Sequence, residues 1–214
     1  MSWESQRIRK QPYMGKIFYI IGKSSTGKDT IYKKLLNIYP GKLKSVVMYT
    51  TRPKRDGEVD GETYNYVSED QYREFKEKGS IIEERSYDTV HGIWRYFTVS
   101  DSLKDIDKED YLILGVLKSF ISTREYFGKD RVIPIYIEVE DGERLTRALK
   151  REKKPGNHRY AEMCRRFLTD TDDFSEDKLK KAGIVKRFEN IDLYACLSEI
   201  EAYIIRETND FGGR

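Results

Sequence analysis

Residues 22–28 have the types and the spacing of a phosphate-binding loop. Their sequence is GKSSTGK, in which Gly22 and Gly27 hold the two glycine positions of the pattern and Lys28 follows directly. Glycines let the backbone curl until successive N–H groups point at one phosphate, and the lysine neutralises the phosphate oxygens. The loop therefore predicts a site for a nucleoside triphosphate. Its expected contacts are Gly22, Lys23, Ser24, Ser25, Thr26, Gly27, Lys28, Asp29 and Thr30.

The residue after the lysine departs from the usual pattern. Serine or threonine normally stands there and its hydroxyl binds Mg²⁺, whereas this chain has Asp29 and then Thr30. A carboxylate can hold Mg²⁺ directly or through water, but without the metal its charge repels a triphosphate. We therefore expect ATP and Mg²⁺ as cofactors, with Asp29 and Thr30 as candidate metal ligands.

A second group of candidate residues lies in TTRPKRDGEVDGETYNYVS, residues 50–68. Arg52 and Arg55 are three positions apart, and Pro53 between them restricts the backbone so that both side chains can converge. Arginine presents paired donors in a planar fork that matches phosphate oxygens, and Tyr64 adds a phenol. The segment predicts a site for a phosphate monoester, although a solvated basic turn would have a similar composition.

The surrounding pattern predicts the elements that hold these residues. Residues 16–21, KIFYII, are typical of a parallel strand covered on both faces, and helical spacing follows Lys28 until Pro40. Strands alternating with helices indicate a parallel sheet. Between about residues 45 and 99, short strands and many tyrosines indicate an inserted substrate subdomain. Further strands are expected at 45–51, 64–68, 81–85, 111–117, 132–139 and near Ile184 and Val185, and helices at 142–154 and 193–205.

Composition and charge exclude several classes of protein. The 40 basic and 37 acidic residues give a net charge of +3, too small to indicate a nucleic-acid or membrane partner. No apolar run approaches the ~20 residues of a membrane-spanning helix, and the first 14 residues lack the apolar region of a secretory signal. We expect a cytoplasmic protein that binds small-molecule nucleotides, while its oligomeric state stays open.

The order of residues in 50–68 resembles the guanylate kinase family. The family pattern Thr-Thr-Arg-x-x-Arg-x-Gly-Glu-x-x-Gly-x-x-Tyr is matched by Thr50, Thr51, Arg52, Arg55, Gly57, Glu58, Gly61 and Tyr64. The resemblance covers about residues 16–204 and is specific in the glycine-rich loop and in 50–68. It implies transfer of the γ-phosphoryl group of ATP to GMP.

The resemblance implies an α/β fold, in which a P-loop kinase core has a parallel β-sheet flanked by helices. A mixed α/β acceptor-binding subdomain and a helical lid are inserted into this core. We expect a tail at 1–14, the core at 15–44, 99–139 and 167–204, the acceptor-binding subdomain at 45–98, the lid at 140–166 and a tail at 205–214. The charged residues 150–159, with Pro155 and Gly156, predict a mobile segment that closes over ATP.

The resemblance also implies roles for individual residues. In the acceptor site they are Arg52, Arg55 and Tyr64 for the phosphate, Glu83 for the guanine edge, Thr98 as a further acceptor-site residue, and Glu58 near the metal or acceptor. The catalytic groups are Lys28, Arg147, Arg151 and Arg166, and Asn190 lies by the donor adenine.

Several of these assignments have alternatives. The arginines of 144–154 also suit a solvated helix face, and Asn190 also suits a helix cap. Arg165 competes with Arg166 for the lid position. Either His91 or Tyr96 lines the acceptor site, and the sequence does not choose between them.

Three residues depart from the family pattern. Met48 stands where the family usually has a serine that contacts the base side, and Gly115 and Leu117 stand where it has two aspartates that order the metal and the acceptor. The identity of the acceptor is therefore open. An aspartate directly after the loop lysine, as at Asp29, is also similar to the pattern of kinases that act on ribose 1,5-bisphosphate. A third interpretation is a non-catalytic guanylate kinase-like module that binds phosphopeptides, which would not need the intact glycine-rich loop.

Overall fold

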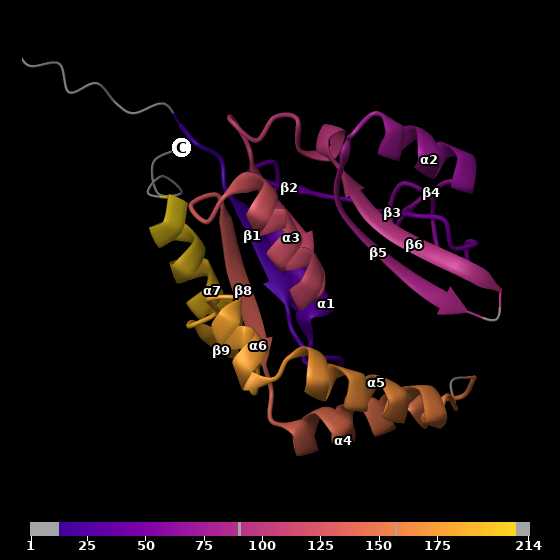
Figure 1. Cartoon of the computed structure of the whole chain (residues 1–214). Helices are drawn as coiled ribbons and strands as arrows, with labels where there is room; N and C mark the ends of the chain where they lie inside the picture. The colour runs from indigo at the N-terminus through magenta and orange to yellow at the C-terminus, as the bar shows by residue number, and fades with distance from the viewer. Residues whose placement is uncertain (1–12, 90, 157, 209–214) are drawn as a thin grey trace, which may run out of the picture.

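A parallel sheet of five strands forms the centre of the fold. In the computed structural model, which describes residues 13–89, 91–156 and 158–208, the strand order is β2-β7-β1-β8-β9 (Figure 1). The strands are β1 (Ile17–Ile21), β2 (Leu43–Ser45), β7 (Asp110–Leu114), β8 (Val132–Glu138) and β9 (Arg187–Glu189). All neighbouring pairs are parallel, and every residue of β1 is buried. The predicted parallel sheet is confirmed.

Helices cover both faces of this sheet. Phe18 and Ile20 point to the face covered by α1 (Lys28–Ile38) and α7 (Leu193–Thr208). Tyr19 points to the opposite face, which is covered by α3 (Leu117–Phe127) and α6 (Glu176–Lys181). Because alternate residues of a strand face opposite sides, β1 contributes to two apolar cores. This buried strand fixes where the glycine-rich loop begins.

A second, mixed sheet lies beside the core. Its strands are β3 (Tyr49–Thr50), β4 (Asn65–Tyr66), β5 (Ile81–Thr89) and β6 (Gly92–Val99), in the order β4-β3-β6-β5. Helix α2 (Glu69–Glu77) packs on this sheet through Tyr72, which lies edge-on to Phe97. Ser68 and Gln71 form a capping box that fixes where α2 begins. A short 3-10 turn, η1 (Ser100–Leu103), leads back to the core.

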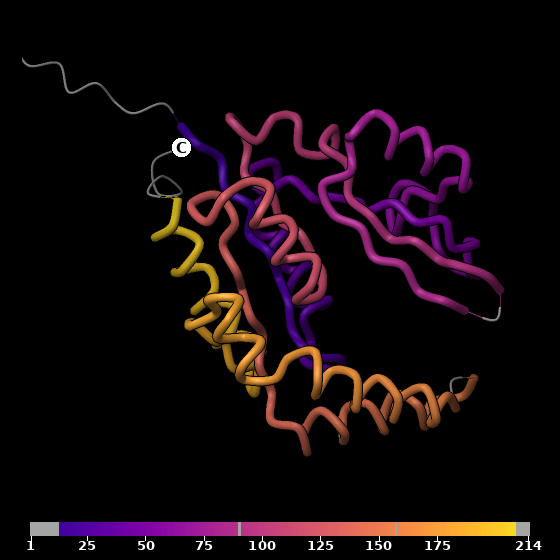
Figure 2. The backbone as a smooth tube through the Cα atoms, in the orientation of Figure 1, coloured from indigo at the N-terminus to yellow at the C-terminus, as the bar shows by residue number. Residues whose placement is uncertain are grey.

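Two helices, α4 (Asp141–Glu152) and α5 (Tyr160–Asp173), follow β8 and pack against each other. Figure 2 shows this helix pair and the β5–β6 hairpin projecting to the same side of the core. Helix α5 continues without a break across the expected lid boundary at residues 166 and 167. Residues 205–208 belong to α7, and the rest of the expected tails, except for residues 13 and 14, lies outside the described residues. No helix among the described residues is long and apolar enough to cross a membrane.

Three predicted strands differ from the structure. The strand expected at 45–51 is divided, because Val46 to Met48 carry the chain from the first sheet to the second. The strand expected at 111–117 ends at Leu114, and Leu117 already begins α3. The strand expected near Ile184 and Val185 begins at Arg187 instead, since only Ile184 enters the core while Val185 is 89% exposed.

Gly115, which follows β7, is closely surrounded. A Cβ atom at this position would lie 2.6 Å from both the hydroxyl and the Cε1 of Tyr19, and 2.8 Å from the Ser119 hydroxyl. Tyr19 is fully buried and its ring packs edge-on against Phe120. The space that a side chain would need at Gly115 is therefore filled from β1.

We expect Gly115→Ala to destabilise the protein by about 1–3 kcal/mol, because the added methyl group overpacks this site. The double variant Gly115→Ala with Tyr19→Leu should lose less stability than the sum of the two single variants, since the shorter side chain leaves room. Gly142→Ala is the comparison variant, because a Cβ there meets the Glu140 carboxylate that caps α4 and meets no buried side chain. Urea unfolding measures all four; strict additivity would contradict the steric explanation.

Candidate functional site

The glycine-rich loop between β1 and α1 needs both of its glycines for steric reasons. A Cβ atom at Gly22 would lie 2.6 Å from the carbonyl oxygen of Ile137 on β8. Gly27 has φ 86°, in the left-handed region, and a Cβ there would lie 2.5 Å from the Asn190 amide nitrogen. The backbone of Ser25 is also in the left-handed region, with φ 65°. The loop is therefore tightly curled between β1, β8 and the residue after β9.

Asn190 holds this loop to the sheet. Its side-chain nitrogen donates to the carbonyl oxygen of Thr26 at 2.7 Å, and its backbone N–H donates to Glu138 at 2.9 Å. The Thr26 hydroxyl in turn donates to the carbonyl of Lys23 at 2.9 Å. Asn190 is 4% exposed, so its hydrogen bonds are shielded from water. The sequence assigned Asn190 to the donor adenine, and the structure places it against the phosphate loop.

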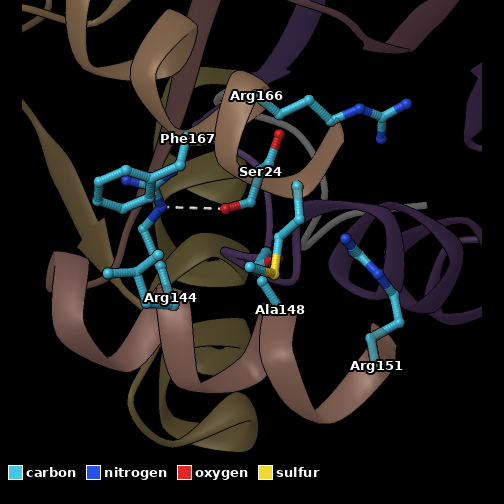
Figure 3. A pocket seen from close by; sticks show the side chains of 9 residues that line it. Ser24, Arg144, Ala148, Arg151, Arg166 and Phe167 are labelled. Carbon is cyan, nitrogen blue, oxygen red and sulfur yellow. Dashed lines mark hydrogen bonds between the residues drawn. The ribbon is translucent and has the colours of Figure 1, made fainter. Parts of the chain in front are cut away.

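Charged residues of α4 and α5 contact the same loop from outside. The Arg144 guanidinium donates to the carbonyl of Ser24 at 3.0 Å (Figure 3). It also donates to the Asp170 carboxylate at 3.1 Å. Asp170 also accepts the backbone N–H of Ser24 at 2.6 Å. Lys23 pairs with Asp141, which also accepts from Arg144. This network ties the helix pair to the loop, and the sequence prediction did not contain it.

Asp141 stays ionised within this network. Burial raises the pKa of Asp141, but the hydrogen bonds from Arg144 and Lys23 outweigh burial and hold the pKa below its ordinary value. Arg144 itself is 1% exposed and its guanidinium lies over the Phe167 ring at 5.0 Å. The buried Arg144 guanidinium therefore links α4, α5 and the phosphate loop through its hydrogen bonds.

The predicted lid arginines occupy two places. Arg147 donates to the backbone carbonyl of Asn190 at 2.9 Å, next to the phosphate loop. Arg151 and Arg166 line a small pocket together with Ser24 and Ser25. The volume of this pocket, about 10 Å³, is the size of one water molecule. Figure 3 shows both side chains extending to the side of Ser24 opposite Arg144. Arg165, the alternative to Arg166, does not line this pocket, although both arginines pair with Glu162.

A second cluster surrounds Arg52, which is 3% exposed. Its guanidinium donates to Glu58 at 2.7 Å, to the Tyr96 hydroxyl at 3.1 Å and to the Pro53 carbonyl at 2.8 Å. Tyr64 packs edge-on against Tyr96, with ring centres 5.5 Å apart, and burial raises the pKa of Tyr64. Its phenol therefore stays protonated and able to donate. The predicted group of Arg52, Glu58 and Tyr64 is brought together.

Arg55 does not converge with Arg52 in this structure. Its backbone N–H donates to Glu58 at 2.8 Å, but its exposed side chain lies over the Trp94 ring at 6.0 Å. Of the two alternatives His91 and Tyr96, Tyr96 contacts Arg52, whereas His91 is exposed at the β5–β6 turn and stacks on Trp94; this position favours Tyr96.

Two further predicted acceptor-site residues, Glu83 and Thr98, are hydrogen-bonded to each other. The Thr98 hydroxyl donates to Glu83 at 2.9 Å, and Arg85 donates its Nε–H to the other oxygen of Glu83 at 3.2 Å. Arg85 also brings Nη2 to 3.3 Å from the sulfur of Met48. The sequence prediction missed Arg85, although its signal was present, because residues 83 and 85 of one strand share a face.

A cavity of about 810 Å³ joins the two clusters; we call it the central cavity. It is lined by residues of the first turns of α1, by 45–48, by 61–64, by Arg85 and by 114–116. Lys28 and Asp29 reach it from the phosphate loop, and Tyr64 reaches it from the Arg52 cluster. Lys28 of the phosphate loop and Tyr64, which packs beside Arg52, therefore line one space, whereas Arg52 itself does not line it.

The described residues contain no group of three His, Cys, Asp or Glu side chains that would hold a metal by itself. Asp29 and Thr30 are exposed in the first turn of α1. Mg²⁺ in phosphate-transfer sites keeps several waters and takes one or two protein ligands along with substrate phosphates. The donor set of Asp29 and Thr30 fits that kind of site.

A strand, a glycine-rich loop and a helix at the centre of a parallel sheet define a P-loop protein. Comparison with protein families matches residues 14–170 to the guanylate kinase model. The chain belongs to the guanylate kinase family, and the resemblance in 50–68 is confirmed.

Individual relatives also support membership of this family. A guanylate kinase of Caldanaerobacter subterraneus subsp. tengcongensis is 28% identical over 94% of this chain and 90% of its own. One from Nostoc sp. is 37% identical, but the match covers only 37% of this chain and 39% of that protein. The crystal structure of guanylate kinase from Anaplasma phagocytophilum has a TM-score of 0.67 at 20% identity, covering 93% of this chain and 89% of that one. That likeness shows the fold.

We expect the Arg52–Glu58 pair to make stability depend on acid pH. The hydrogen bond from Arg52, opposed by burial and assisted by the Arg55 N–H and the Tyr66 hydroxyl, lowers the pKa of Glu58 from 4.5 to about 2. The folded pKa is the lower one, so this stabilisation is present above about pH 4.5 and is lost as the pH falls toward 2. Because Glu58 is partly exposed, screening reduces the contribution to about 1–2 kcal/mol.

Glu58→Gln should therefore lower the unfolding free energy at neutral pH and flatten its acid dependence, measured by urea unfolding at a series of pH values. Glu62→Gln, in the same exposed loop, is the matched control and should leave the profile unchanged. An unchanged acid profile in Glu58→Gln would show that the ion pair does not contribute.

Proposed function

We propose that the chain is an ATP-dependent nucleoside monophosphate kinase that transfers the γ-phosphoryl group of ATP to GMP. The observation that carries this proposal is the central cavity, in which Lys28 of the phosphate loop and Tyr64 of the Arg52 cluster share one space. Phosphoryl transfer needs two phosphate sites that face each other so that attack is in line. The membership of the guanylate kinase family supports the same reaction.

The donor end would bind ATP through the loop residues Gly22 to Thr30. Their N–H groups and the positive end of α1 favour the β-phosphate, and Lys28 neutralises the β- and γ-oxygens. When bound, Mg²⁺ would supply further charge neutralisation, with Asp29 and Thr30 as its protein ligands. Asn190 would act mainly by fixing the loop, with the adenine beside it.

The acceptor end would hold the phosphate of the nucleotide through Arg52, Arg55 and Tyr64. Glu58 holds Arg52 in one orientation, in which it would meet the phosphate. Arg55 would turn from Trp94 toward the phosphate, which needs only a change of side-chain rotamer because its backbone is fixed by Glu58. No side-chain nucleophile is required, since the acceptor phosphate attacks directly.

The helix pair would act as a lid. Arg147, Arg151 and Arg166 lie on α4 and α5 close to the phosphate loop, and they would stabilise the charge that develops on the transferring group. We propose that residues 140–166 close over the bound ATP, that residues 45–98 carry the acceptor, and that the reaction takes place in the cytoplasm. Both cysteines are free thiols, which fits a reducing compartment.

The proposal is tested by measuring ADP release with ATP and Mg²⁺ against GMP, dGMP, AMP, CMP, UMP and ribose 1,5-bisphosphate. We expect turnover with GMP, and a loss of at least about 100-fold in kcat in Lys28→Ala, because the charge of the β- and γ-oxygens is then not neutralised. Lys34→Ala is the matched control: this lysine lies on the same helix over the Tyr194 ring and does not line the central cavity.

Either of two results would overturn the proposal in part or in full. Turnover with ribose 1,5-bisphosphate alone would keep the donor site and reassign the acceptor. No turnover with any acceptor, together with binding of a phosphopeptide, would indicate a non-catalytic module.

We expect Arg52→Ala to raise the KM for GMP by about 10- to 100-fold and to leave the KM for ATP nearly unchanged, because a charge-assisted pair of hydrogen bonds to the acceptor phosphate is lost. Steady-state kinetics with each substrate varied separately checks this split. Arg73→Ala, an exposed arginine on α2, is the control. Equal changes for both substrates would instead point to a general loss of structure.

A further inference from the structure

Arg85 has an unusual position for a charged residue. It lies on β5, its side chain is 8% exposed, and it lines the central cavity with Met48, Tyr64 and Gly115. Removing a guanidinium from water costs free energy unless its donors find partners. The partners of Arg85 therefore indicate what this part of the cavity is built to bind.

The hydrogen bonds of Arg85 leave donors free toward the cavity. Nε donates to Glu83 at 3.2 Å, and Nη2 lies 3.3 Å from the thioether sulfur of Met48, which is only a weak acceptor. Among the described residues, Nη1 has no hydrogen-bond partner. Glu83 keeps Arg85 charged: burial lowers the pKa of Arg85, but the neighbouring carboxylate raises it above its ordinary value. Nη1 is thus available to a ligand, and Nη2 is held only by a weak acceptor that a better one would replace.

Glu83 lies behind Arg85. Its side chain is 1% exposed and does not line the central cavity. One carboxylate oxygen accepts from Thr98 and the other accepts from Arg85, so the carboxylate orients the guanidinium. The family resemblance gave Glu83 the direct contact with the guanine edge. In this chain Arg85 stands between Glu83 and the cavity, which makes Glu83 a positioning residue.

The chemistry of Arg85 selects one kind of base edge. A guanidinium donates two parallel hydrogen bonds to the O6 and N7 acceptors that a 6-oxopurine presents side by side. An adenine presents an amino group at C6, so donor would face donor. Met48 stands where the family usually has a serine near the base, and Nη2 of Arg85 lies against it. Arg85 therefore supplies the donor that Met48 cannot.

We infer that Arg85 is the specificity-determining residue of the acceptor site and that it selects 6-oxopurine nucleoside monophosphates through O6 and N7. This inference rests on the proposed kinase function. It has a consequence for the 2-amino group of guanine: with Glu83 held behind Arg85, that group makes no selective contact. GMP and IMP should therefore be acceptors of similar quality.

The experiment compares kcat/KM for GMP, IMP, AMP and 2-aminopurine ribonucleoside monophosphate, which keeps the amino group of GMP and lacks O6. We expect GMP and IMP to agree within about 10-fold, and the two bases without O6 to be about 10- to 100-fold poorer. Arg85→Ala should lower kcat/KM for GMP and IMP by about 10- to 100-fold and leave 2-aminopurine ribonucleoside monophosphate nearly unchanged, which removes the preference.

Three variants keep the result interpretable. Arg85→Gln retains one amide donor and should give an intermediate preference, and it serves if Arg85→Ala does not fold. Glu83→Gln should weaken the preference for O6 without creating a preference for the 2-amino group. Arg95→Ala is the matched control, because this arginine lies on the neighbouring strand, pairs with Glu69 and does not line the cavity. Thermal unfolding verifies that each variant is folded.

Binding measured by equilibrium dialysis separates this inference from the proposed function. If no acceptor is phosphorylated but GMP and IMP bind with an affinity that Arg85→Ala lowers, the kinase proposal fails and the role of Arg85 stands. The role of Arg85 is wrong if the wild type prefers GMP over IMP by more than about 100-fold while accepting 2-aminopurine ribonucleoside monophosphate. It is also wrong if Arg85→Ala leaves the preference for O6 intact.

Discussion

The hydrogen bond from the Asn190 side chain to the Thr26 carbonyl is the contact on which the rest of the site depends. It joins the end of β9 to the glycine-rich loop, and it fills the space that any side chain at residue 27 would need. The loop can therefore take only a tightly curled path into α1. That path sets where α1 begins and brings Lys28 to the central cavity.

Three buried arginines around the site are each held by a carboxylate of the chain itself. Glu58 holds Arg52, and Glu83 holds Arg85. The network of Arg144 with Asp170 and Asp141 follows the same rule beside the phosphate loop. Internal pairing keeps buried guanidinium groups charged and in fixed orientations. It also explains how a site for anions fits a chain whose net charge is only +3.

Local patterns in the sequence predicted the features that depend on near neighbours along the chain. The buried strand β1, the curled loop and α1 follow from apolar runs and glycine spacing. The sequence could not place Arg85 in front of Glu83 or Asp170 against Ser24. Asp170 and Ser24 are joined only when α5 folds back on the loop, and the order of Arg85 and Glu83 depends on where the cavity lies relative to β5. The family pattern gives Glu83 the contact with the guanine edge, and we propose that Arg85 makes the selective contact instead.

Arg144 fixes the first turn of α4 to the phosphate loop, so the proposed closing of the helix pair would pivot about this turn. An α-helix rises about 1.5 Å per residue, which places Arg147 about 5 Å and Arg151 about 10 Å from the pivot along the axis. Any rotation about that turn displaces Arg151 about twice as far as Arg147. One small change in the angle of α4 would therefore move the charge of Arg151 farther than the charge of Arg147.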